Sequence, residues 1–282
     1  MIIDFHTHTF PSRISKLVIE KLSNVSGTLP HTDGSAEGLA DSTISSGFDY
    51  SVNLPVITNP AKSFKINQDM VSQYEELKLR HIISFGGIHP DCEDYKEQLS
   101  FLKNNGIAGI KIHPAYQGVN LDDIRYLRII EYASSLDLIV LTHAGIDIGI
   151  YDHNYSDVDS ILTVMKEVSP HKLVLAHMGN WGCWDKVRKY LLGCNAYFDT
   201  AFSLGPIEHS LADAPTPYYD TVIDDNLFTY ICKGHGIDKI LFGSDSPWQS
   251  QSDYLARIKG LDFTDEEFAM IAGGNAEKLL KL

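Results

Sequence analysis

Short apolar runs recur along the chain, and longer stretches of mixed apolar and polar residues separate them. The runs are rich in Val, Ile and Leu and are bounded by Gly, Pro, Asn or Asp, which is typical of buried strands. They cover residues 2–8, 50–56, 81–90, 106–114, 138–145, 172–180, 196–202 and 239–248. The pattern therefore predicts eight strands.

The segments between these runs have helical periodicity. Residues 65–80, 95–106 and 121–136 carry apolar side chains three and four positions apart, as amphipathic helices do. The connection after the first run is long enough for two helices. Near the end of the chain, Thr264 and Glu267 have the spacing of a capping box, which predicts a helix start.

Strands that alternate with helices predict a parallel sheet with right-handed crossovers. Eight such units close into a (β/α)8 TIM barrel, and we assign residues 1–282 to a single α/β domain of this kind. An open doubly wound sheet is the alternative, but no GxGxxG motif follows the first run. Two irregular connections, 146–159 and 203–220, would lie at the C-terminal face of a barrel. They are candidate substrate loops, and solvated insertions are the alternative.

Composition narrows the classes of partner. The 282 residues carry a net charge of −14, which disfavours nucleic acid as a partner of the surface. No run approaches the ~20 apolar residues of a membrane span, and we see no secretion signal. The four cysteines have no CxxC spacing, as in reduced cytoplasmic proteins. We expect a cytoplasmic protein with a small-molecule substrate, and the sequence leaves a homo-oligomer open.

Ligand-type side chains collect at the C-terminal ends of the predicted strands, which a barrel brings to one mouth. They are His6 and His8 on the first strand, Lys111 and His113 on the fourth, His143 on the fifth, His177 on the sixth and Asp245 on the eighth. Residues two apart on a strand point the same way. We therefore predict that His6 and His8 face the interior, with Phe5 and Thr7 outward.

This set has the chemistry of a metal site. Neutral imidazoles from His6, His8 and His143 and the carboxylate of Asp245 suit Zn²⁺ best, with Mn or Fe as alternatives. A divalent ion lowers the pKa of bound water towards ~7, and Asp245 is placed to accept the proton. A lone HxH arises often by chance, and a lone buried His is more often a core residue. The shared position at the strand ends favours a metal site.

The chain resembles the amidohydrolase superfamily, specifically the amidohydrolase-2 group of metal-dependent TIM-barrel hydrolases. The matching stretches are DFHTHTF, GIKIHP, VLTHAG, LVLAHMGNW, YFDTAF, ILFGSDSPW and GGNAEKLL, in the family's order along nearly the whole chain. The resemblance implies that His6, His8, His143 and Asp245 hold the main metal. It also implies that His177 either holds a second ion or acts as a catalytic and orienting residue, so one or two ions are expected.

Two other families are similar only in part. GGIHPD (86–91) is similar to a stretch of TatD-type nucleases, but those carry a Glu where this chain has Lys111. PHP-type phosphoesterases share an early HxH but close with a DxH motif, whereas this chain closes with GSDSP.

Lys111 has three interpretations. In some superfamily members a lysine at this position is carboxylated and bridges two metals. Alternatively, its ammonium binds a substrate carboxylate, or it pairs with a buried acid such as Asp199. We rank the last two above carboxylation, and we predict that His113 and Trp181 also contact substrate.

We expect a hydrolase in which metal-activated water attacks the carbonyl of an amide, lactone or ester of a small anionic substrate. Asp245 would move the proton and His177 would stabilise the developing charge. The alternative is a lyase, a non-oxidative decarboxylase or hydratase that uses the same site on a small carboxylic acid. A binding protein on a degenerate barrel is the third reading.

Overall fold

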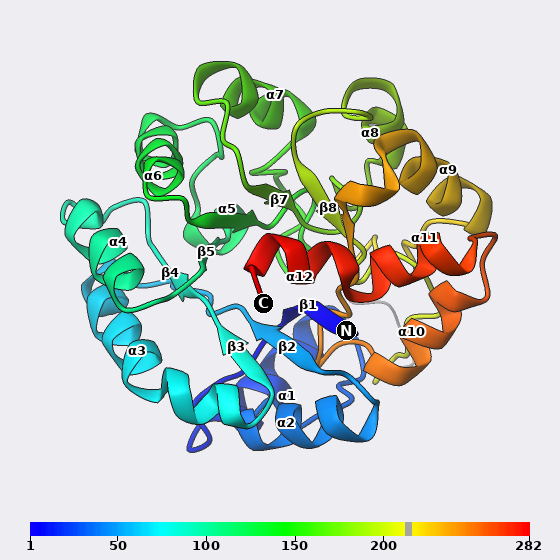
Figure 1. Ribbon diagram of the computed structural model, residues 1–282, viewed down its shortest axis with the longest axis horizontal. Helices are drawn as coiled ribbons and strands as arrows, with labels where there is room; N and C mark the ends of the chain where they lie inside the picture. Colours follow the sequence, from blue (N-terminus) through cyan, green and yellow to red (C-terminus); the bar gives the residue numbers. More distant parts are fainter. Residues whose placement is uncertain (212–215) are drawn as a thin grey trace.

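The computed structural model describes residues 1–211 and 216–282. A ring of short strands lies at its centre and helices surround the ring (Figure 1). All strand pairs in the described part of the chain are parallel. The strands are β1 (Ile3–Thr7), β2 (Tyr50–Asn53), β3 (Ile82–Ser84), β4 (Gly86–Gly87), β5 (Gly109–Ile112), β6 (Ile139–Thr142), β7 (Leu173–Leu175), β8 (Tyr197–Asp199) and β9 (Ile240–Leu241).

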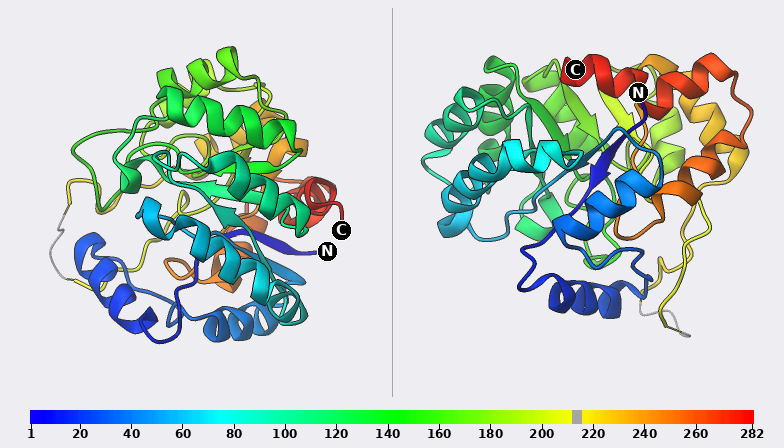
Figure 2. Two further views of the ribbon diagram at one scale, coloured as in Figure 1. Left: turned by 90° about the vertical axis from the view of Figure 1, so that its left-hand side faces the viewer. Right: turned by 60° about the horizontal axis from the view of Figure 1, so that its bottom comes forward.

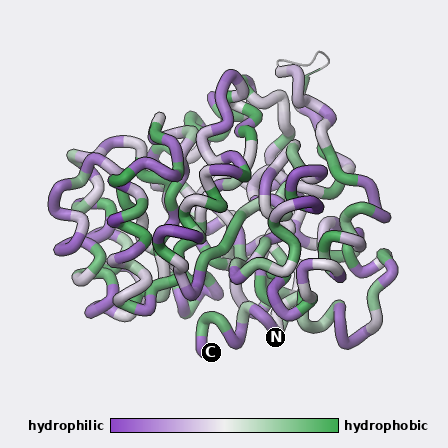
Figure 3. Tube along the Cα trace, turned by 90° about the horizontal axis from the view of Figure 1, so that it is seen from above, coloured by the Kyte–Doolittle hydropathy of each residue, from purple (hydrophilic) through white to green (hydrophobic). Residues whose placement is uncertain are grey.

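The predicted alternation of strands and helices, and with it the (β/α)8 barrel, is confirmed. The α-helices are α1 (Ser15–Ser26), α2 (Ala36–Ser45), α3 (Ser63–Leu79), α4 (Tyr95–Asn104), α5 (Pro114–Gln117), α6 (Ile124–Ser135), α7 (Val158–Glu167), α8 (Trp184–Tyr190), α9 (Asp225–His235), α10 (Gln251–Lys259), α11 (Asp265–Ala269) and α12 (Asn275–Leu280). Two helices follow β1, as expected, and the capping box of Thr264 and Glu267 starts α11. Polar and apolar positions interleave along the outer helices (Figure 3), as amphipathic helices require.

Main-chain hydrogen bonds join the last strand segment to the first. The Phe5 amide donates to the Phe242 carbonyl at 2.8 Å, and the Asp245 amide donates to the His6 carbonyl at 2.8 Å. The His8 amide donates to the Ser246 carbonyl at 2.7 Å. These bonds complete the ring of strands, and they hold the segments that carry His6 and Asp245 side by side.

One predicted strand is divided. The run 81–90 forms β3 and β4, which are separated at Phe85 and belong to different sheets. The Phe85 amide still donates to the Asn53 carbonyl at 3.0 Å, so the wall continues across the break. Phe85 itself is fully buried in the barrel interior and meets Phe5 edge to face.

A cluster of buried apolar side chains fills the interior of the barrel, and it shows that Phe5 points inward and not outward as predicted. It joins Phe5 to Leu141, Val174 and Leu241, which only side chains inside the barrel can do. The pairing of β1 with β2 shifts register between Asp4 and Thr7. Such a bulge breaks the strict alternation of a strand, so Phe5 and His6 both turn away from the outer helices.

The C-terminal helix covers the N-terminal end of the barrel. Ala276 and Leu279 of α12 belong to the interior cluster, and both chain ends lie at this end of the barrel (Figure 2). A Cβ atom at Gly273 would lie 2.2 Å from the Met1 carbonyl oxygen, so only glycine fits where the turn before α12 passes the residues that precede β1. Among the described helices, none is both long and apolar enough to cross a bilayer.

Candidate functional site

A cavity of about 860 Å³ opens at the C-terminal ends of the strands. Every predicted site residue lines it, namely His6, His8, Lys111, His113, His143, His177, Trp181 and Asp245. The loop 146–159 also contributes, through residues 146–149. The described residues of the loop 203–220 do not line the cavity, and its residues 212–215 lie outside the described part.

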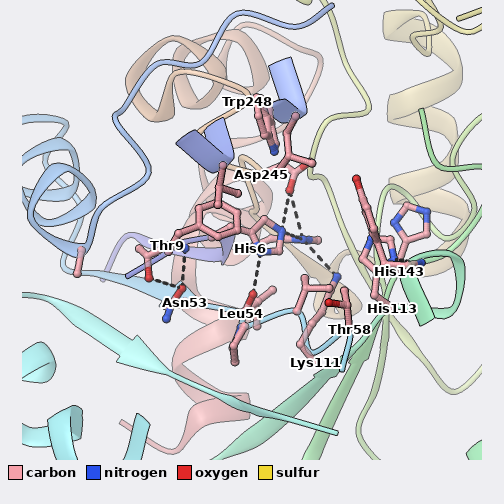
Figure 4. Close-up of a pocket in the computed structure, with 18 of the residues that line it drawn as sticks. His6, Thr9, Asn53, Leu54, Thr58, Lys111, His113, His143, Asp245 and Trp248 are labelled. Atoms are coloured by element: carbon pink, nitrogen blue, oxygen red, sulfur yellow. Dashed lines mark hydrogen bonds and ion pairs between the residues drawn. The ribbon is translucent and has the colours of Figure 1, made fainter. Parts of the chain in front are cut away.

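Three predicted ligands converge. The Nε2 atoms of His6 and His8 are 3.1 Å apart, and Oδ1 of Asp245 lies 3.4 Å from the first and 3.1 Å from the second (Figure 4). Ligand atoms bound to tetrahedral zinc at 2.0–2.1 Å are separated by roughly 3.3 Å. The three atoms therefore already have the spacing of a metal coordination sphere.

Hydrogen bonds on the far side of each ring show why a cation fits here. Nδ1 of His6 donates to Oδ2 of Asp199 at 2.8 Å, and Nδ1 of His8 donates to the Leu54 carbonyl at 2.8 Å. In the neutral rings both Nε2 atoms then carry lone pairs that face each other, and Nζ of Lys111 lies 3.4 Å from that of His6. Burial, followed by the Lys111 charge, keeps the pKa of His6 well below its ordinary value, so Nε2 of His6 carries no proton. A divalent cation would relieve the repulsion between the two lone pairs, and partners at Nδ1 are typical of histidines that bind metal.

A hydrogen bond joins the rings of His177 and His143. Nδ1 of His177 donates to the Ala201 carbonyl at 2.8 Å, which leaves its Nε2 as an acceptor. That Nε2 lies 3.1 Å from Nδ1 of His143, and Nε2 of His143 is buried without a hydrogen-bond partner. The structure thus places His143 beside His177, and not in the ligand group of His6, His8 and Asp245.

His143 also belongs to a group with His113 and Asp147. The rings of His113 and His143 are stacked, with centroids 4.3 Å apart and an angle of 15° between the planes. A metal lies in the plane of the imidazole that binds it, and two nearly parallel planes do not meet at one ion. The stacking therefore argues for hydrogen bonding at His113 rather than for a shared metal.

Asp147 is the site residue that sequence reasoning missed. It is buried in the loop after β6, and its Oδ1 accepts a hydrogen bond from the Gly149 amide at 2.8 Å. Burial raises its pKa to about 6. The one available signal was its place in the long loop 146–159, because a single Asp outside a strand end has no motif.

Lys111 is buried on the cavity floor with its Nζ 3.4 Å from Nε2 of His6 (Figure 4). The expected pairing with Asp199 is not seen, since Asp199 holds His6 instead. No carboxylate in the described residues forms an ion pair with Lys111. Burial lowers its pKa to about 8, against the opposing effect of nearby carboxylates.

Two site residues adopt an uncommon backbone conformation. His177 has a φ of 60° and Asp245 a φ of 65°, in the left-handed region that residues other than glycine rarely adopt. Such strain costs about 1–3 kcal/mol and persists where the surroundings enforce it, often at functional sites. Here it directs both side chains into the cavity.

Comparison with known proteins identifies the family. The amidohydrolase family model matches residues 3–282. No curated protein sequence matches the chain. The fold is similar to an uncharacterised TIM-barrel protein from Bordetella bronchiseptica, with a TM-score of 0.74, 17% identity and coverage of 99% of this chain and 98% of that one.

Two decarboxylase structures share the fold at lower identity. One is 5-carboxyvanillate decarboxylase from Novosphingobium aromaticivorans with bound manganese (TM-score 0.68, 12% identity, 100% and 97% of the two chains). The other is 2,6-dihydroxybenzoate decarboxylase in complex with 2,6-dihydroxybenzoate. Its TM-score is 0.66 and its identity 13%, and the match covers 100% of this chain and 99% of that one. The whole-chain match shows that this protein belongs to the amidohydrolase family, in its amidohydrolase-2 group.

Proposed function

We propose that this protein is a metal-dependent lyase that removes the carboxyl group of a small aromatic or unsaturated carboxylic acid as CO2. The observation that carries the proposal is Lys111, a buried ammonium on the cavity floor without an ion pair in the described residues. A buried ammonium without an ion pair is costly, and a substrate carboxylate beside it would supply the missing charge. The hydrolase expected from the sequence becomes the second candidate.

His6, His8 and Asp245 would hold the metal, and the fit rests on their spacing and on the two opposed lone pairs. A divalent ion there would polarise a substrate oxygen and offset negative charge that develops as the bond breaks. Zinc suits the donor set, and manganese is bound in one similar structure. Asp199 fixes the ring of His6 from behind, and His177 orients His143.

The chain's own residues then carry the remaining steps. Lys111 would hold the substrate carboxylate over the site. The bond from the carboxyl carbon to the substrate breaks, the electron pair stays on the substrate carbon, and a proton must take the place of CO2. We assign that proton transfer to Asp245, which lies next to the ligand histidines and would take a proton from solvent water and pass it to that carbon.

The walls of the cavity suit a flat apolar substrate. Trp181 and Phe202 lie 6.3 Å apart between ring centroids, and Trp248 also lines the cavity. The indole Nε1 of Trp181 donates to the Phe202 carbonyl at 3.0 Å, which fixes the ring. The similar structures named as decarboxylases act on aromatic acids, which supports the same substrate class here.

The test is product analysis on protein loaded with zinc or manganese. A panel of small aromatic and enoic acids should release CO2 and yield the acid with hydrogen in place of its carboxyl group. Metal-free protein and the His8→Ala variant are the controls. Turnover of amides, lactones or esters without CO2 release would instead establish the hydrolase.

One observation favours the hydrolase. Nδ1 of His143 and Nε2 of His177 are 3.1 Å apart, so a second cation could replace the proton between them. With a carboxylated Lys111 as a bridge, this would be a two-metal site, which many hydrolases use. Elemental analysis tests this two-metal form of the hydrolase, because it needs two equivalents of metal and the lyase as proposed needs one.

A further inference from the structure

His113 and Asp147 have no role in the chemistry above, yet both are buried at the cavity wall. His113 follows β5 directly, and Asp147 lies in the loop after β6. The two strands are neighbours in the barrel, so the two side chains meet on one side of the cavity. Nε2 of His113 is 3.6 Å from Oδ2 of Asp147, which is beyond hydrogen-bond range.

The proton on His113 is placed by its other nitrogen. Nδ1 of His113 accepts a hydrogen bond from the Tyr116 amide at 3.3 Å, so a neutral ring carries its proton on Nε2. The ring is held between His143, stacked at 4.3 Å, and Tyr116, at 4.5 Å between centroids. His113 therefore presents one fixed N–H donor.

Asp147 presents the matching acceptor. Its Oδ1 accepts from the Gly149 amide, and its Oδ2 faces Nε2 of His113 across a gap of 3.6 Å. A methyl group at Gly149 would lie 3.2 Å from Oδ1 of Asp147 and 3.3 Å from the Tyr116 hydroxyl oxygen. The glycine therefore keeps this corner of the cavity open.

We infer that His113 and Asp147 form a subsite for a hydroxyl group of the substrate. This rests on the proposed function, and it narrows the substrate to a hydroxylated carboxylic acid. One hydroxyl oxygen can accept from His113 and donate to Asp147. An ether oxygen has no proton for Asp147, an ammonium cannot accept from His113, and a second carboxylate is repelled by Asp147.

The experiment measures binding separately from turnover. Zinc-loaded protein is titrated by calorimetry at pH 7.5 with 2-, 3- and 4-hydroxybenzoate, with the three methoxybenzoates, and with benzoate. At least one hydroxybenzoate should bind roughly 10- to 100-fold more tightly than its methoxy counterpart, because the ether leaves a buried acceptor unpaired. In Asp147→Ala this preference should fall to about twofold or less, with benzoate affinity little changed.

Asp152→Ala is the matched control, since Asp152 is an exposed residue of the same loop and does not line the cavity. It should keep the full preference. The inference is overturned if wild-type protein shows no hydroxyl preference, if none of these acids binds, or if Asp147→Ala keeps the preference. A preference that depends on Asp147 without any CO2 release would leave the subsite standing and remove the decarboxylase.

Discussion

Asp4 and Ser244 are joined by two hydrogen bonds across the seam of the barrel. Oδ1 of Asp4 accepts from the Ser244 amide at 3.0 Å, and Oδ2 accepts from the Ser244 hydroxyl at 2.5 Å. The His6 amide, 3.2 Å from Oδ1, is bound by the same carboxylate. Because Ser244 precedes Asp245, this carboxylate ties the two segments that carry the candidate metal ligands.

Asp4→Asn should therefore weaken metal binding. The amide group keeps the shape of the side chain but turns N–H groups towards donors, which disturbs the spacing of His6 and Asp245. We expect about a tenfold or larger loss of zinc affinity, measured by competition with a chromogenic chelator. Asp41→Asn, on the exposed side of α2, is the control. Unchanged affinity in the folded variant would show that Asp4 does not position the site.

Removal of ligand side chains should have a larger effect than removal of their supports. His6→Ala and His8→Ala should each lose most of the bound metal in elemental analysis. Asp199→Asn should retain the metal with about 10- to 100-fold lower affinity, because only the orientation of His6 is lost. His171→Ala, at an exposed histidine, should behave as the parent. A His8→Ala protein with full metal content would reject the assigned ligand set.

Lys111→Met tests the role of the buried ammonium. The variant should keep one equivalent of metal and bind anionic substrate roughly 10- to 100-fold more weakly, which appears as a raised KM. Lys103→Met, at an exposed position of α4, should change neither quantity. Native mass spectrometry of the parent adds an independent check, since carboxylation of Lys111 would increase the mass by that of one CO2. Such a mass increase would support the bridged two-metal site.

Asp147→Asn should stabilise the metal-free protein at neutral pH. The folded pKa of Asp147, about 6, lies above its ordinary value of 3.8, so the folded state binds the proton more tightly than the unfolded state. Below pH ~4 both states are protonated and the variant gains nothing. As pH rises towards 6 only the unfolded chain ionises, and wild type loses roughly 3 kcal/mol of stability that the variant keeps. Urea unfolding at pH 4 and pH 7.5 measures the difference, and equal gains at both pH values would contradict it.

The sequence predicted the barrel because its signals are local. Each buried strand is a short run of branched apolar residues, and the capping box of Thr264 and Glu267 marks its helix without tertiary information. The direction of Phe5 was wrong, because a register shift between β1 and β2 depends on how two strands pair. The division of the third strand at Phe85 likewise depends on pairing between strands, because β3 pairs in one sheet and β4 in the other.

The site was predictable as far as strand ends identify it. All the predicted side chains line one cavity, since parallel strands bring their C-terminal ends together. The grouping of His143 with His177 and His113 follows from ring orientations that spacing does not determine. Asp147 was missed because its loop is placed only once β6 and β7 are packed.

The cover that α12 forms over the barrel has a practical consequence for handling the protein. Met1 N lies 3.8 Å from a carboxylate oxygen of Glu277, so the two chain ends are neighbours at the end of the barrel away from the cavity. A short linker could join them, and new ends could be opened in a surface loop elsewhere. Attachment to a sensor surface through the C-terminus would leave the cavity mouth facing solution, which suits the binding measurements described above.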